Sequence, residues 1–457
     1  MKQLFVQILF RYPETIFSWL ICNKEKLWVK SVMGFILLLP VGFYFYLIQA
    51  HCLNIPFKDD FELLEFSNRI IQDEIFLRKT NLFFEQHNEH RIATPRLFFY
   101  LLLKMTSKVD FKVAIFYGNA LLLVLLLVFY KLIHSDKRQL LFLIPAAFLL
   151  FQLQHWENMA SAIGVLSNFS VVLFAGISFY LLNRTDFFGL SVSILFAMLA
   201  MFTTGAGVFV FISGAVFLLL TRKFNFFIVW SSAFILNLIL YFHDYVKPEH
   251  HPSIIETLSH PAKSFLYLVS FLGGSFSVDN HFFVPLAPLA GIGALVYLVY
   301  LTYKKYYLKD PGIYCFMMFL LLVGVAAALT RSGFGLHQAF SSRYKIFSTA
   351  YLILMYLTLV NSPPAWAKRF KATFLCYIVL FAVVFNALSF SRNYMHLEIY
   401  TGRISYNMRN WVMMNEGVNI GTLNFSGKIM RDALNNGIYR FSCKEVKLRK
   451  EDQAKWC

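Results

Sequence analysis

The chain has 457 residues, of which 58% are hydrophobic and only 15% are charged, and it contains 52 phenylalanines. A soluble domain is nearer half apolar and a quarter charged, so this composition excludes an ordinary soluble protein and favours a helical protein that crosses a membrane many times. The formal net charge of +17 does not indicate nucleic acid binding, because basic residues collect at cytoplasmic loops and lipid headgroups and no RNA-binding motif, zinc spacing or glycine-rich nucleotide loop accompanies it.

Residues 1–30 precede the first long apolar run. They combine apolar and aromatic residues with several basic ones, and the lack of a small-residue cleavage site argues against a removed signal peptide. We predict an interfacial segment on the cytoplasmic face. The first membrane span is predicted at about 31–50, and the basic flank before it places the N-terminus in the cytoplasm.

Residues 51–110 form a first extracytoplasmic loop, which is periplasmic in a Gram-negative bacterium. The loop contains a short apolar run, 97–103, whereas crossing a bilayer core takes about 20 residues. If that run crossed, the basic residues between 131 and 138 would lie outside, against the tendency of Lys and Arg to stay in the cytoplasm. We therefore predict that 97–103 lies along the outer interface.

The remaining apolar runs alternate across the membrane and bring the total to about eleven spans. They are predicted at about 111–133, 139–154, 162–182, 188–202, 205–221, 224–242, 285–303, 312–330, 344–360 and 370–390. A second outer loop covers 243–284, where the apolar piece 265–276 dips without crossing. Residues 391–457 form a small basic tail outside. The predicted fold class is all-α: a multi-pass protein of the bacterial inner (plasma) membrane, with a transmembrane domain over 31–390 and with the active face and the C-terminus in the periplasm.

This topology gathers acids, histidines and arginines at the outer ends of the spans. The candidate catalytic residues are Asp59 and Asp60, just beyond the first span. The candidate substrate-binding residues share the outer face and are Glu89, His90, Arg91, Arg96, His155, Glu157, Arg331, His337, Arg343 and Tyr344.

These residue types suit transfer of a group from a lipid phosphate to a hydroxyl. A partly desolvated carboxylate has a raised pKa and can act as a general base, which is worth roughly 10²–10⁴ in rate. Arginine binds phosphate through paired N–H donors and stabilises it as a leaving group. A cytosolic nucleotide cannot reach the outer face, so the activated donor is expected to be a lipid.

Several motifs carry a family resemblance. They are Asp59-Asp60 within FKDDF after the first span, the interfacial TPRLFFYLLLK run, and HNEHR, HWEN, TTGAG and SSRY. Over most of residues 30–390 the layout resembles the GT-C superfamily of polytopic glycosyltransferases. The resemblance implies an acidic catalytic residue and interfacial helices in the first outer loop, a polyprenyl-phosphate sugar as donor, and a surface glycan or lipid as acceptor, with membrane lipids around the protein and no nucleic acid. The tail after 391 matches no GT-C soluble domain.

Each candidate also has a structural interpretation. Asp59 or Asp60 could cap the helix that follows, since Asp is a favoured N-cap. The HNEHR motif could be a solvated turn, and HWEN a polar cluster around an interfacial tryptophan. The late arginines could anchor to lipid headgroups.

A metal ion is an open question at this stage. A divalent cation bound by Asp59 or Asp60 stays an alternative. Four histidines of the second outer loop match no zinc-ligand spacing: His243, His250, His251 and His260. The six cysteines fit no metal pattern either, and Cys443 can pair with Cys457 only if the tail faces an oxidising compartment.

Two other functions stay open beside glycosyl transfer. A polysaccharide (O-antigen) polymerase or ligase would also place arginines and an acid outside, typically in a large late loop. A transporter of lipid-linked glycans would place charges near the bilayer midplane, often with internal repeats. In this sequence the key residues are concentrated in the first outer loop and the span interiors are nearly uncharged, which favours a membrane glycosyltransferase with an aspartate as general base.

Overall fold

The computed structural model describes residues 15, 19, 23, 26–134, 139–184, 186–248, 257–278, 284–363, 371–414 and 424–448. These residues are almost wholly helical, and they include one antiparallel hairpin made of β1 (Gln86–His87) and β2 (His90–Arg91). The predicted all-α class is confirmed. The predicted interfacial segment 1–30 lies mostly outside the described residues.

Among the described residues, eight segments are long and apolar enough to cross a membrane, as predicted for a multi-pass protein. Five lie in single helices: α3 (Leu27–His51), α7 (Phe111–Lys131), α14 (Phe224–Phe242), α17 (Leu286–Tyr303) and α22 (Lys371–Met414). The other three are α8 (Gln139–Leu150) with α9 (Trp156–Met159), α10 (Ala162–Gly164) with α11 (Ser170–Leu182), and α19 (Pro311–Arg331) with the turn after it. Three more predicted spans correspond to shorter helices, which are α12 (Phe187–Met201), α13 (Val208–Leu220) and α20 (Lys345–Asn361). The total of about eleven spans therefore stays a prediction.

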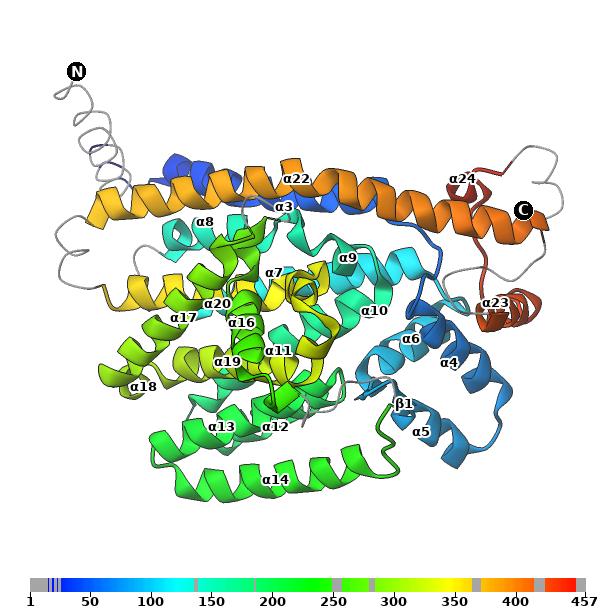
Figure 1. Cartoon of the computed structure of the whole chain (residues 1–457), viewed down its shortest axis with the longest axis horizontal. Coiled ribbons are helices and arrows are strands. Elements are labelled where there is room, and N and C mark those ends of the chain that lie inside the picture. The colour runs from blue at the N-terminus through cyan, green and yellow to red at the C-terminus, as the bar shows by residue number, and fades with distance from the viewer. Residues whose placement is uncertain are drawn as a thin grey trace.

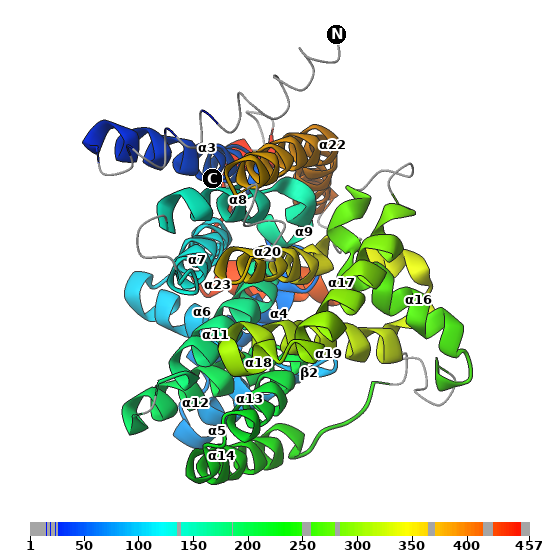
Figure 2. The ribbon, with the colours of Figure 1, turned by 90° about the vertical axis from the view of Figure 1, so that its left-hand side faces the viewer.

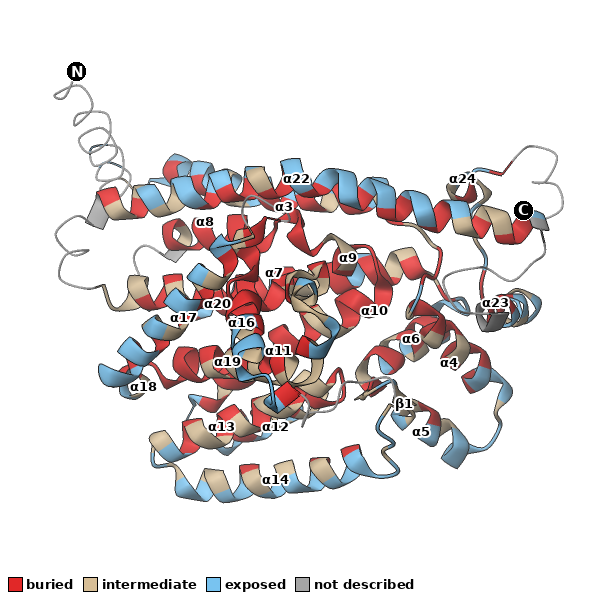
Figure 3. Ribbon diagram, in the orientation of Figure 1, coloured by how far each residue is buried: buried red, intermediate tan, exposed pale blue. Residues whose placement is uncertain are grey.

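The helices form an elongated bundle whose axes run mainly along its length (Figure 1). Viewed from its end, α3 and α22 lie on one side and α14 on the opposite side, with α11 and α19 between them (Figure 2). Burial follows this arrangement, because the inner helices are mostly buried and α14 exposes one long face (Figure 3). The exposed side chains of the outer helices include Ile235, Ile239 and Val299, as expected for surfaces in contact with lipid tails.

Helix α22 is much longer than its predicted span. It has 44 residues, or about 66 Å at 1.5 Å per residue, against a bilayer core of about 30 Å. The predicted boundary at residue 390 therefore falls inside a continuous helix, and residues 391–414 extend that helix. Beyond it, α23 (Asn424–Asn435) packs against the first outer loop, and α24 (Cys443–Val446) packs against α22.

The segment predicted to be the first outer loop, and given that name below, consists of α4 (Asp60–Gln72), α5 (Phe76–Phe84), the hairpin and α6 (Ala93–Thr106). Helix α6 contains the run 97–103. It has 14 residues, fewer than a crossing requires, and it buries Phe99 while exposing Leu101 and Met105. This amphipathic burial agrees with the interfacial position predicted for the run.

Short segments connect the helices of the bundle. They are the single-turn or few-turn pieces η2 (Leu153–His155), η3 (Val165–Phe169), η4 (Gly205–Gly207), η5 (Gly274–Ser277), η6 (Ser332–Phe334), η7 (Leu336–Phe340) and η8 (Ser342–Tyr344), with the helix α16 (Pro261–Leu272). The short helix α18 (Tyr306–Lys309) follows α17 at the end of the bundle opposite to α23 (Figure 1). Helix α16, in the predicted second outer loop, packs directly on α17. The two backbones are so close at Gly273 that a Cβ there would lie 1.9 Å from the carbonyl oxygen of Ala287.

Candidate functional site

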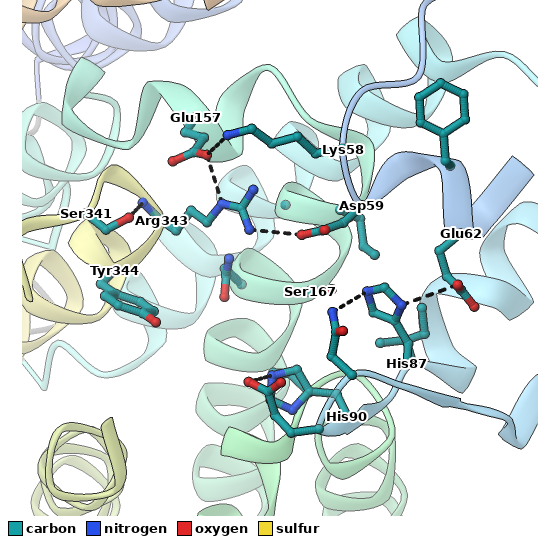
Figure 4. A pocket seen from close by; sticks show the side chains of 18 of the residues that line it. Lys58, Asp59, Glu62, His87, His90, Glu157, Ser167, Ser341, Arg343 and Tyr344 are labelled. Atoms are coloured by element: carbon teal, nitrogen blue, oxygen red, sulfur yellow. Dashed lines mark hydrogen bonds and ion pairs between the residues drawn. The ribbon is translucent and has the colours of Figure 1, made fainter. Parts of the chain in front are cut away.

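A polar cavity of about 940 Å³ lies where the first outer loop meets the irregular segments after α8 and α19. Side chains from four parts of the chain line it, and many of them point toward one another (Figure 4). They include Lys58, Asp59, Glu62, Glu65, His87, Asn88, Glu89, His90, Glu157, Asn168, Arg331, Arg343 and Tyr344. The cavity therefore contains acids, cations and imidazoles in the same space.

Asp59 faces this cavity and is held by Arg343. The Nη1 atom of Arg343 lies 3.0 Å from Oδ2 of Asp59, and its Nε lies 3.0 Å from Oε1 of Glu157 (Figure 4). Lys58 approaches the same Glu157 oxygen at 3.4 Å. Burial disfavours the charge of Arg343, but the carboxylates of Glu157 and Asp59 outweigh that effect and raise the pKa of the guanidinium, so this arginine stays charged. The Asp59 side chain makes no capping hydrogen bond to α4.

The HWEN and SSRY motifs meet beside Asp59. The backbone N–H of Glu157 donates to Oγ of Ser342 at 3.0 Å, and the Asn158 amide donates to the carbonyl oxygen of Arg343 at 2.8 Å. Asn168 in turn donates to Oδ1 of Asn158 at 2.9 Å. These contacts fix the backbone on which Glu157 and Arg343 stand.

Asp60 has different surroundings from Asp59. It is 1% exposed, it is not among the residues that line the cavity, and it accepts hydrogen bonds from the backbone N–H of Ile163 at 2.8 Å and from Oγ of Ser161 at 3.2 Å. Burial raises the pKa of Asp60 to about 7, although these bonds and the N–H of Phe57 act to lower it. Asp60 ties the first outer loop to the start of α10.

The hairpin contributes a second group of polar residues. His87 pairs with His90 across the two strands, and Asn88 at the turn adopts the left-handed backbone conformation with φ of 49°. Glu89 forms an ion pair with Arg331, and Nε2 of His90 lies 3.5 Å from Glu89.

The TTGAG motif supports His90. The N–H of Gly205 donates to Nδ1 of His90 at 3.2 Å. A Cβ at Gly205 would lie 3.0 Å from the same nitrogen, so a larger residue at position 205 would crowd the imidazole.

Two of the predicted binding arginines stabilise the hairpin and do not line the cavity. Arg91 donates to the carbonyl oxygens of Phe84, Tyr241 and His243. Arg96 is 1% exposed and bonds to Glu62 and to backbone oxygens of residues 83 and 85. Their guanidinium groups are used inside the protein, so the structure gives them no contact with a substrate.

The two other predicted histidines also lie outside the lining. His155 is fully buried, with its ring 5.9 Å from that of Tyr44 and 5.2 Å from that of Phe169. His337 belongs to η7, and of that segment the adjacent Gln338 lines the cavity. The other predicted binding residues do line the cavity, and their contact with a substrate stays a prediction: Glu89, His90, Glu157, Arg331, Arg343 and Tyr344.

A second cavity of about 530 Å³ adjoins the first. It shares Glu89, His90 and Arg331 with the polar cavity, together with Asn168, Thr204 and Tyr344. The rest of its lining is mainly apolar and comes chiefly from α13, α14, α16, α19 and α20, including Phe209, Phe242, Phe271, Val323, Ala327 and Phe347. Arg331 thus stands at the boundary between a polar chamber and an apolar one.

No family model matches the chain, and neither a curated protein nor a solved structure matches it. The likeness to the GT-C superfamily is therefore still a prediction. Within the part of the chain that the structure describes, no three His, Cys, Asp or Glu side chains are grouped so that they could hold a metal ion. His250 and His251 lie outside the described residues.

The lining includes charged and imidazole side chains that were not predicted as site residues, among them Lys58, Glu62 and His87. A sequence signal existed for Glu62, because positions three apart in a helix share a face and Glu62 follows Asp59 by three. His87 belongs to the HNEHR motif, but a turn with two histidines gives no indication of which ring faces a cavity.

Proposed function

We propose that the protein is a membrane glycosyltransferase that moves a sugar from a polyprenyl-phosphate donor to a hydroxyl of a surface glycan or lipid. The observation that supports this most directly is the pair of adjoining cavities, one polar and one apolar, with Arg331 and His90 at their boundary. The donor consists of an apolar isoprenoid chain, a phosphate and a polar sugar, in that order. This order matches an apolar cavity, an arginine at the boundary and a polar cavity.

The phosphate is assigned to the boundary and the lipid chain to the apolar cavity. Arg331 lines both cavities, and a guanidinium beside a phosphate stabilises the charge that develops as the sugar departs. Arg343 fits this role less well than the sequence suggested, because Asp59 and Glu157 already engage two of its nitrogens.

Asp59 is assigned as the general base. Arg343 holds Oδ2 of Asp59, which leaves Oδ1 to accept the proton of an acceptor hydroxyl in the polar cavity. Base assistance of this kind contributes roughly 10²–10⁴ in rate. Asp60 cannot serve here, since its two oxygens accept from the interior backbone.

The cavity is assigned to the extracytoplasmic side of a bacterial plasma membrane. Cys443 takes part in a disulfide, which is typical of an oxidising compartment; Cys457, its predicted partner, lies outside the described residues. Helix α23, from the same tail, packs against α4, so the tail and the cavity are on one side. The opposite end of α17 carries Lys304 and Lys305, in agreement with the positive-inside tendency.

The test uses purified protein in lipid nanodiscs with polyprenyl-phosphate glucose, mannose, galactose and arabinose, and with lipid and glycan extracted from bacterial envelopes as acceptors. We expect release of polyprenyl phosphate from at least one donor. Asp59→Asn and Arg331→Gln should each slow the release about 100-fold or more, whereas Asp73→Asn and Arg392→Gln, outside both cavities, should not. A wild-type protein that releases polyprenyl phosphate from none of the donors and does not bind polyprenyl phosphate contradicts the proposal.

A further inference from the structure

Glu62, His87 and Arg96 form a chain of contacts that ends at the polar cavity. Nδ1 of His87 lies 3.3 Å from Oε2 of Glu62 (Figure 4), and the other oxygen of Glu62 is bound by Arg96. Arg96 is 1% exposed and is itself fixed by the carbonyl oxygen of Glu85 at 2.6 Å. An imidazole oriented by a carboxylate, which is oriented by a third group, is the arrangement that positions a histidine for proton transfer.

The contacts of His87 define which of its two ring nitrogens can face a substrate. Nδ1–H donates to Glu62, so the remaining nitrogen is Nε2, which lies 3.3 Å from Nδ2 of Asn88. His87 lines the polar cavity, and its side chain is 16% exposed. A substrate oxygen can therefore reach Nε2 by taking the place of the Asn88 amide.

His90 is less suited to carry a proton. Its Nδ1 accepts from the backbone N–H of Gly205 at 3.2 Å, and its Nε2 is the nitrogen nearest Glu89. Protonation of Nδ1 would replace a hydrogen bond with two facing N–H groups. The backbone N–H of Gly205 cannot turn away from Nδ1 of His90, whereas the partner of Nε2 of His87 is the side-chain amide of Asn88, which can rotate to present its oxygen when that nitrogen carries hydrogen.

We propose that His87 is the general acid of the reaction and gives a proton to the departing phosphate, with Glu62 and Arg96 as positioning residues. This role rests on the proposed glycosyl transfer. The hairpin supports it, because His87 pairs across the strands with His90, next to the Glu89–Arg331 ion pair where the phosphate is assigned.

The sugar transfer combines one exchange of bonds at the anomeric carbon with two proton transfers. The bond between the anomeric carbon and the phosphate oxygen breaks, and its electron pair goes to that oxygen. The acceptor oxygen bonds to the anomeric carbon and loses its proton to Asp59, while Nε2–H of His87 protonates the phosphate. Asp59 then releases a proton to water and His87 takes one up, so the cycle closes. A phosphate monoester has its second pKa near 6, so the departing phosphate can accept a proton near neutral pH.

The charged groups around His87 keep this arrangement in place. They come from three elements: Glu62 and Glu65 on α4, Glu89 and His90 on the hairpin, and Arg96 on α6. Burial acts to raise the pKa of Glu62, but the hydrogen bond and charge of His87 and the charge of Arg96 together lower it to about 2. Glu62 is therefore ionised at any working pH and can accept the Nδ1–H of His87.

The test measures polyprenyl phosphate release by the nanodisc protein as a function of pH. We expect His87→Gln to lower kcat about 100-fold with KM little changed, and to abolish the fall in rate that the wild type shows as pH rises and the acid loses its proton. Added imidazole should restore part of the rate of His87→Ala. Glu62→Gln should keep the falling limb but move it to lower pH. His260→Gln, at an exposed histidine before α16, should behave as the wild type.

The outcomes separate this role from the proposed function. If the wild type turns over no donor, glycosyl transfer itself is wrong. If it does and Asp59→Asn is inactive, but His87→Gln keeps the wild-type rate, His87 is not the acid. A slow His87→Gln with the wild-type pH profile, and a His87→Ala that imidazole does not restore, would show that the residue only supports the hairpin and would overturn the proposal.

Discussion

Asp59 and Asp60 are neighbours in the chain, yet their carboxylates have opposite surroundings. Asp59 has a side chain 38% exposed and an ion pair with Arg343, whereas Asp60 is buried under hydrogen bonds from Ile163 and Ser161. The difference arises because the chain turns sharply at Lys58, which has a φ of 52°, and adjacent side chains leave the start of α4 in different directions. One aspartate is thereby available for chemistry and the other for packing.

Asp60→Asn should remove part of the pH dependence of stability. The pKa of Asp60 is raised to about 7 in the folded protein. The contribution of its protonated carboxyl to the free energy of unfolding is therefore complete below the unfolded pKa near 3.9 and is lost as pH rises through about 7. At about 1.4 kcal/mol per pKa unit, this contribution is up to about 4 kcal/mol. The melting temperature of the wild type should therefore fall more steeply between pH 4 and 7 than that of Asp60→Asn. Parallel curves for the two proteins would contradict this assignment; Asp73→Asn is the control.

The sequence predicts the types of residue at this site better than their directions. Asp59, Glu157, Arg331 and Arg343 were expected at the outer ends of helices, and all four line the cavity. Arg91 satisfies the same rule, but its guanidinium faces three backbone carbonyls. Position along a span can be read from hydropathy, whereas the direction of a side chain depends on tertiary contacts that a single sequence does not contain.

Among the elements, the hairpin depends most on one side chain. Arg91 reaches carbonyl oxygens on both sides of the hairpin, at Phe84 and at Tyr241 and His243 of the α14 end. The planar fork of arginine makes several such bonds at once, which a lysine ammonium cannot reproduce. The position of His87, Glu89 and His90 relative to α14 follows from these bonds.

Arg91→Lys should therefore loosen the hairpin. Losing charged hydrogen bonds to buried carbonyls costs about 1.5–3 kcal/mol each, so we expect a lower melting temperature and faster amide exchange over residues 84–92. Arg69→Lys is the matched control, because the Arg69–Glu85 pair is about half exposed and such a surface pair contributes about 1 kcal/mol or less. Equal effects of the two substitutions on exchange in the hairpin would disprove the role of Arg91.

Asn54 is one of the residues that join the tail to the first outer loop. Its N–H donates to Glu445 at 2.9 Å, its amide donates to the carbonyl of Arg440 at 3.0 Å, and its carbonyl accepts from the hydroxyl of Tyr439 at 2.7 Å. Oδ1 of Asn54 also accepts from the N–H of Phe111 at 2.8 Å. One residue just after α3 thus connects the tail to the start of α7.

Asn54→Ala should free the tail without unfolding the bundle. The substitution removes both side-chain bonds. It leaves the N–H of buried Phe111 without an acceptor, at a cost of about 1–3 kcal/mol, whereas the exposed carbonyl of Arg440 can bond to water. Hydrogen exchange measured by mass spectrometry should become faster over 438–448 and stay unchanged in α8. Asn435→Ala, at an exposed position, is the control. Unchanged exchange over 438–448 would mean that other contacts hold the tail.

At the scale of the whole molecule, hydropathy predicted where the long apolar helices lie in the chain, and the helix α6 that contains the run 97–103 is too short for a comfortable crossing. Hydropathy did not predict that α22 continues to Met414, because residues 391–414 become polar while staying helical. A helix that leaves the bilayer can remain helical when other elements pack on it, as Tyr400 does on Phe57 and Trp156. The polarity of a segment therefore marks the membrane boundary and not the helix end.

The orientation of the molecule can be tested at its two ends. Lys305 follows α17 and Lys428 lies in α23, at opposite ends of the bundle (Figure 1). If the cavity is extracytoplasmic, a membrane-impermeant maleimide applied to intact spheroplasts should label Lys428→Cys and leave Lys305→Cys unlabelled until the membrane is opened, because charge asymmetry places the lysine-rich end inside. Labelling is read by mass spectrometry at each site, and a wild-type sample controls for native cysteines. The reverse pattern would place the cavity in the cytoplasm, where a soluble nucleotide donor could reach it, and would remove the main reason for a lipid donor.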